Sequence, residues 1–155
     1  PITLRHLVTH TSGLPRMPGN FRPADPKRPY VDYDRKMLFD YLSKVKLRRP
    51  PGKYEYSNYA MGILGTTLGD CWDSTYEEAL TSRILKPLEL NDTRITLNDS
   101  MQKRMTPGYN GTLKEEPVWD FDAIAGAGAI RSTAADMVKF IQANLRTDDS
   151  PITLA

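Results

Sequence analysis

Apolar residues recur every three or four positions in several stretches of this sequence. This is the spacing of one face of an α-helix. Several of these stretches begin at a residue whose side chain can cap a helix, such as Thr3 or Thr133. The pattern predicts a short helix after Thr3 and longer helices over about 34–45, 58–68, 74–85 and 133–145.

The alternation of polar and apolar residues that is typical of strands is rare in this chain. Thr93–Leu97 alternates and can form a short strand, whereas residues 98–124 are predicted to be loop with a helical turn near Gln102. The sequence therefore predicts a mainly α fold with long loops and with too few strands for a substantial sheet. We expect residues 1–155 to form a single, partial domain.

Residues 15–33 are rich in proline and charge, and they predict a surface loop. Its length is unusual for a compact domain. Two interpretations stay open: the loop is directly functional, or it is a mobile lid.

Composition excludes some classes of function. Charged residues make up 26% of the chain and apolar residues 39%, which is ordinary for a soluble globular protein. A net charge of +2 is too small to indicate a nucleic-acid partner. No apolar run is long enough to span a membrane, and no cofactor is predicted. The chain begins at Pro1, without a methionine and directly before a helical pattern, and resembles the interior of a longer protein, so the compartment stays open.

The stretch from Pro51 to Gly62 carries the clearest chemical pattern. Pro51 and Gly52 predict a turn, and Ser57 or Asn58 can cap the helix that follows. The phenol of Tyr56 and the carboxamide of Asn58 lie two positions apart at this junction, where both can face one cleft.

Together with Ile2–Pro15, this stretch resembles the serine β-lactamase-like family, which includes class C β-lactamases, DD-peptidases and esterases. The resemblance implies the helical domain of the β-lactamase/transpeptidase-like fold, without most or all of its antiparallel sheet. It also implies that Tyr56 exchanges a proton with a catalytic serine and the leaving group. Asn58 would then hydrogen-bond the substrate and the lysine of the family's Ser-x-x-Lys motif.

Two further segments strengthen the resemblance. Ile84–Thr93 is similar to the family's Pro-Leu-Gly-Met/Leu-x-Asp-Thr turn, and Ala125–Thr133 with Asp136 is similar to its Ala-Gly-Gly-x-x-Ser-Thr-x-x-Asp segment. Small residues at Gly128 and Ala129 imply close approach of the backbone to a substrate. Class C β-lactamases carry a tyrosine in this segment, so its absence favours an esterase or a peptidase.

The motifs that would complete such a site are missing. Ser-x-x-Lys occurs at 43–46 and at 100–103, but neither copy stands where the family has its nucleophile, far upstream of the tyrosine. No Lys-Thr-Gly or His-x-Gly follows Leu145. The resemblance thus implies that the nucleophile, the closing motif and the strands lie outside both ends of this chain.

Two hypotheses for function follow. The first is a segment of a serine hydrolase that acts by acyl transfer on a small-molecule ester, β-lactam or peptide, with the isolated chain inactive. The second is a non-catalytic binding or scaffold domain derived from the same fold. In either case, helical faces that would pack on the absent sheet would be exposed and would favour self-association.

Two groups of basic or metal-binding side chains remain. His6 and His10 have helical i, i+4 spacing, but no third ligand is evident, so we predict a structural role and no metal. A basic run comprises Lys44, Lys46, Arg48, Arg49 and Lys53. It either complements a helix C-terminus or attracts anionic substrates, and we favour the first interpretation.

Overall fold

The structure is a computed structural model that describes residues 1–47 and 49–146. The chain divides into two compact units. The first comprises Pro1–Tyr76 and Met105–Ala129, and the second comprises Glu77–Arg104 and the residues from Ile130 onward. Each unit is described by itself below, and the expectation of one partial domain over 1–155 stays a prediction.

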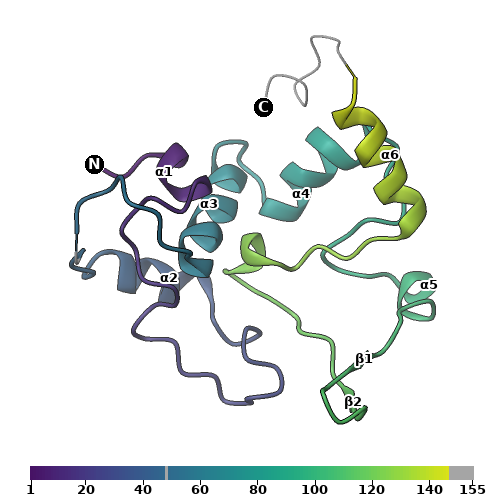
Figure 1. Cartoon of the computed structure of the whole chain (residues 1–155), viewed down its shortest axis with the longest axis horizontal. Helices are drawn as coiled ribbons and strands as arrows, with labels where there is room; N and C mark the ends of the chain where they lie inside the picture. Colours follow the sequence, from purple (N-terminus) through teal and green to yellow (C-terminus); the bar gives the residue numbers. More distant parts are fainter. Residues whose placement is uncertain (48, 147–155) are drawn as a thin grey trace. The chain divides into compact units, whose positions relative to one another are not determined.

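The described residues are mainly helical, as predicted (Figure 1). The first unit contains α1 (Leu4–Val8), α2 (Arg35–Leu42), α3 (Asn58–Asp70) and the 3₁₀ turn η2 (Ala125–Ala127). From Tyr76 onward follow α4 (Tyr76–Leu80), the π-helical turn η1 (Thr81–Leu85), α5 (Asp99–Gln102) and α6 (Ala134–Asn144). Five helices are preceded by an N-cap residue whose side chain accepts a backbone N–H of the first turn. These residues are Thr3, Asp34, Ser57, Asn98 and Thr133.

The described residues contain one small sheet, in the first unit. In it β1 (Gly108–Tyr109) pairs antiparallel with β2 (Glu115–Glu116). The prediction of a strand over Thr93–Leu97 is wrong, because that segment forms only an isolated bridge between Arg94 and Arg131. The Glu77 carboxylate accepts the N–H groups of Ile95 and Thr96, which would otherwise be free to extend the pairing.

No helix or strand interrupts the chain between Val8 and Arg35, so the loop predicted over 15–33 is confirmed. The loop nevertheless packs against the first unit. The Asn20 amide donates to the Met37 carbonyl of α2 at 2.9 Å, and the Tyr30 ring stacks on Phe121 at 4.5 Å. These contacts attach the loop to the core of its unit.

Helix α3 supplies much of the core of the first unit and lies beside α1 and η2 (Figure 1). Gly62 and Gly65 face η2 and the residue before it: a Cβ on Gly65 would lie 3.0 Å from the Gly126 Cα. A Cβ on Gly126 would lie 2.3 Å from the Met61 carbonyl oxygen. These backbones approach too closely for a larger side chain, which explains the glycines inside α3.

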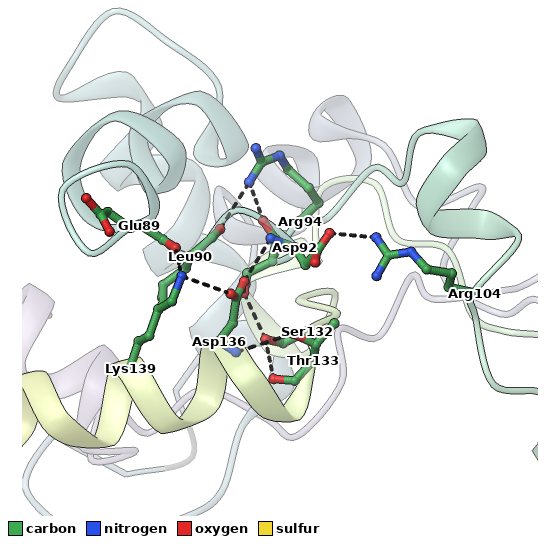
Figure 2. Close-up of polar contacts among 10 residues, drawn as sticks. Glu89, Leu90, Asp92, Arg94, Arg104, Ser132, Thr133, Asp136 and Lys139 are labelled. Carbon is green, nitrogen blue, oxygen red and sulfur yellow. Dashed lines mark hydrogen bonds and ion pairs between the residues drawn. The ribbon is translucent and has the colours of Figure 1, made fainter.

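The second unit is organised around the carboxylate of Asp136, which is 4% exposed (Figure 2). Its Oδ2 accepts the Asp92 N–H at 2.8 Å and the Thr93 hydroxyl at 2.7 Å. Lys139, one turn later on α6, donates to the Glu89 carbonyl at 2.5 Å. The start of α6 is therefore fastened to the 89–93 turn, and two of the segments that carry the family resemblance are joined.

The apolar stripe of α6 is exposed, and its members are Met137, Val138, Phe140, Ile141 and Leu145. The residues that α6 buries are Asp136 and Ala143. This exposure supports the expected tendency to self-associate, which itself stays a prediction. Among the described residues, no helix combines the length and the hydropathy of a membrane span.

Gly126→Ala is expected to lower the free energy of unfolding by about 1–3 kcal/mol, because the new methyl group must displace the α3 backbone. Urea unfolding followed by circular dichroism measures the loss. Gly111→Ala is the control, since a Cβ there meets no atom within 4 Å. Equal stability of the two variants would contradict the close packing of α3 on η2.

Asp136→Ala is expected to cost about 3 kcal/mol, because it removes the acceptor of the Asp92 N–H and the Thr93 hydroxyl. The control is Asp92→Ala, whose carboxylate forms an exposed ion pair with Arg104 and should matter much less. Thermal unfolding compares the two variants. A larger loss for Asp92→Ala would show that the buried carboxylate is not the main polar support of this unit.

Candidate functional site

The Tyr-x-Asn stretch, which is Tyr56–Asn58, enters α3 through Ser57, the N-cap residue of this helix. The buried Ser57 hydroxyl accepts the Ala60 N–H at 2.9 Å and donates to the Pro15 carbonyl at 2.7 Å. Of the two candidate caps, Ser57 therefore performs this role. The Asn58 side chain is left available for other contacts at the first position of the helix.

Tyr56 lies just before the cap, with its side chain 41% exposed. Its ring packs against the imidazole of His10, with 4.5 Å between the ring centroids. The Arg16 guanidinium lies 5.2 Å from the centroid of the same ring. The phenol is thus accessible, next to an imidazole and a cation.

His10 holds the chain on both sides of Tyr56. Its Nδ1 accepts the Ser57 N–H at 3.2 Å, and its carbonyl accepts the Glu55 N–H at 2.8 Å. Its backbone is left-handed, with φ of 56°, which is uncommon for a residue other than glycine. Because Nδ1 is the acceptor, a neutral ring carries its proton on Nε2.

Asn58 is half-buried, and its amide nitrogen makes one weak contact, to the Met17 sulfur at 3.7 Å. Among the described residues, the side-chain oxygen of Asn58 accepts no hydrogen bond. The carboxamide therefore retains an acceptor for a ligand.

The structure distinguishes the two small residues predicted to bind substrate. Gly128 is exposed, and a Cβ placed there would meet no atom within 4 Å. Ala129 is buried, and its N–H donates to the Ala125 carbonyl at 3.1 Å. The space beside Gly128 is thus open to a ligand, whereas the side chain and N–H of Ala129 are occupied internally. Substrate binding by either residue stays a prediction.

Two other tyrosines of the first unit, Tyr33 and Tyr59, are buried and have structural roles. Burial raises the pKa of Tyr33 to about 12, and burial likewise raises the pKa of Tyr59 above its ordinary value. The Tyr59 hydroxyl donates to the Leu38 carbonyl at 2.8 Å, deep in the core. Neither phenol is suited to proton transfer near neutral pH.

The histidine pair has the structural role that the sequence predicts. The His6 Nδ1 accepts the Thr3 N–H at 3.2 Å in the capping box of α1, and His10 holds Ser57. Across residues 1–47 and 49–146, no three His, Cys, Asp or Glu side chains gather as a metal site would require.

Sequence reasoning missed the packing of His10 and Arg16 against Tyr56. About forty residues or more separate them from Tyr56 in the chain, and a left-handed histidine has no strong local signal. The only hint was the position of His10 just before the turn at Gly13, inside the segment that resembles the family.

His10→Ala is expected to lower the free energy of unfolding by about 1–3 kcal/mol, because the partly buried Ser57 N–H loses its acceptor and Tyr56 loses a packing face. Hydrogen exchange at the Ser57 amide should also accelerate. His6→Ala is the control, since it disturbs only the exposed cap of α1 and should leave Ser57 protected. Unchanged exchange at Ser57 in His10→Ala would contradict the role of His10.

The chain that forms this site is similar to known proteins over nearly its whole length. The family model described as Beta-lactamase matches residues 1–154. D-alanyl-D-alanine-carboxypeptidase/endopeptidase AmpH of Escherichia coli (strain K12) is 33% identical over 150 residues, covering 96% of this chain and 37% of the relative. A beta-lactamase of Yersinia enterocolitica is 30% identical over 155 residues, covering 97% of this chain and 36% of the relative.

A solved beta-lactamase/D-alanine carboxypeptidase from Pseudomonas syringae superposes with a TM-score of 0.79 at 26% identity, over 97% of this chain and 41% of that protein. The chain spans just over a third of the length of the Escherichia coli and Yersinia enterocolitica relatives. The family predicted from the sequence motifs is confirmed: the chain belongs to the β-lactamase family.

Proposed function

We propose that this chain is one wall of the active site of a serine hydrolase that acts by acyl transfer on a small-molecule ester, β-lactam or D-alanyl peptide. The observation that carries the proposal is the paired presentation of Tyr56 and Asn58. An exposed phenol is held by His10, and two residues later a carboxamide retains a free acceptor.

The chemistry assigns different roles to the two side chains. An ordinary phenol is a poor base at neutral pH, so a phenol that relays a proton depends on the groups around it. Arg16 is a cation next to the Tyr56 ring in this chain. Tyr56 would pass a proton between the nucleophilic serine and the leaving group, and the Asn58 amide would orient the substrate.

The nucleophile is proposed to lie in a longer protein, because neither Ser-x-x-Lys copy of this chain has suitable surroundings. Ser43 is the C-cap residue of α2, and its hydroxyl donates to the Asp40 carbonyl at 3.0 Å. Ser100 lies on the short exposed helix α5 of the second unit. The described residues would thus be the helical part of the β-lactamase/transpeptidase-like fold, with most of the sheet contributed by residues outside this chain.

The second candidate function is a non-catalytic binding or scaffold domain of the same family. Both functions are compatible with these 155 residues, in which no Ser-x-x-Lys is suitably placed. The sequence of the longer protein distinguishes the two functions: a Ser-x-x-Lys motif upstream of the segment that begins at Ile2 indicates the enzyme.

The isolated chain is expected neither to hydrolyse nitrocefin nor to react with a fluorophosphonate probe, because its sequence has no Ser-x-x-Lys where the family has its nucleophile. Intact-mass spectrometry after incubation with the probe tests this prediction. Covalent labelling of the chain would contradict it, and the labelled serine would identify the true nucleophile.

In the longer protein, Tyr56→Phe is expected to lower kcat by about 10²–10⁴-fold while leaving the fold intact, because only the phenolic hydroxyl is removed. Tyr54→Phe is the matched control: this neighbour is 66% exposed and its ring meets His10 edge-on. Hydrolysis of p-nitrophenyl esters and of nitrocefin measures both variants. Full activity of Tyr56→Phe would exclude the proton-relay role.

A further inference from the structure

A concave site lies in the first unit, beside Tyr56 and Asn58. It is a pocket of about 330 Å³, which is within the range of small-molecule sites. Its walls come from the segment after α1, from the end of α2 with the residues that follow it, and from the segment before α3. They are formed by Gly13, Pro15, Arg16, Met17, Tyr41, Val45, Lys46 and Glu55.

The walls combine an apolar surface with a few charges. Pro15, Met17, Tyr41 and Val45 provide apolar or aromatic surface. This is the usual composition of a site that binds a small organic molecule, in which a small number of polar groups fix its orientation.

The charges of the pocket favour an anion. The Glu55 carboxylate is paired with the Arg49 guanidinium at 2.5 Å, so its negative charge is compensated. Among the described residues, no carboxylate forms an ion pair with Arg16 or Lys46. The two cations of the lining thus face a pocket whose single acid already has a partner.

This arrangement changes the interpretation of the basic run. Helix α2 ends at Leu42 with no basic residue in its last turn, and only Lys44 of the run directly follows its C-cap residue, Ser43, so the helix-terminus interpretation does not extend to Lys46 or Arg49. Lys46 instead lines the pocket, and Arg49 compensates Glu55. Arg48 lies outside the described residues.

Two of the lining residues also touch the Tyr-x-Asn pair. The Arg16 guanidinium lies against the Tyr56 ring, and the Met17 sulfur accepts from the Asn58 amide. A ligand in the pocket would therefore perturb both Tyr56 and Asn58.

We propose that this pocket binds a small monocarboxylate with a short apolar tail. The carboxylate pairs with Arg16 and Lys46, and the tail packs on Met17, Tyr41 and Val45. The site is complete within this chain and needs no serine nucleophile. It therefore goes beyond the proposed function, and binding can be measured on the chain alone.

The test is a titration of the ¹⁵N-labelled chain with sodium hexanoate at constant ionic strength, followed by amide chemical shifts. We expect saturable shifts, confined mainly to residues 13–17, 41, 45–46 and 55–58, with a dissociation constant on the order of 1 mM. Hexanamide has the same tail without the charge, and should bind at least about fivefold more weakly.

Arg16→Gln and Lys46→Gln should each weaken hexanoate binding by at least about fivefold, because each removes one charge partner of the carboxylate. Lys44→Gln is the control, since Lys44 belongs to the same basic run but is absent from the pocket lining and should leave binding unchanged. The dispersion of the amide spectrum shows that each variant is folded.

The proposal is overturned if hexanoate produces no saturable shifts, if hexanamide binds equally well, or if Lys44→Gln weakens binding as much as Arg16→Gln. None of these outcomes bears on acyl transfer, which is tested separately by the activity of Tyr56→Phe. Failure of one proposal therefore leaves the other standing.

Discussion

The candidate site depends on the hydrogen bonds of one buried residue, Ser57. Its hydroxyl caps α3 through the Ala60 N–H and donates to the Pro15 carbonyl, while its own N–H donates to His10. Two segments that are distant in sequence, residues 10–15 and residues 57–60, thus meet at a single serine. Because Tyr56 and Asn58 flank this serine, the same bonds that start the helix also set where the phenol and the carboxamide emerge.

Close backbone packing gives that arrangement a firm base. Gly62 and Gly65 allow α3 to approach the backbone of Ile124 and Gly126 to within van der Waals contact. Glycine inside a helix costs about 1 kcal/mol relative to alanine, and burial of Tyr59, Ile63 and Ile124 against the core offsets that cost. Packing therefore makes the body of α3 rigid, and one end of the helix is presented to solvent.

The sequence predicted the helices well because capping and periodicity are local signals: Thr3, Asp34 and Thr133 each cap a helix at the expected place. The prediction failed where a distant side chain accepts the backbone N–H groups of a segment, as Glu77 does at Thr93–Leu97. The hairpin of β1 and β2 was missed although Asn110-Gly111 is a strong turn signal, because its strands have only two residues each. Tyr56 and Asn58 were identified from a family resemblance, whereas the contacts of His10 and Arg16 come only from tertiary structure.

The central claim is that this chain alone orients Tyr56 through His10 and Ser57. The most direct measurement is a nuclear Overhauser spectrum of the 155-residue chain, in which the His10 and Tyr56 rings are assigned. The account predicts strong cross-peaks between the two rings, as expected for centroids 4.5 Å apart. Absent cross-peaks, with a Tyr56 ring that shows the averaged shifts of a free tyrosine, would contradict the claim.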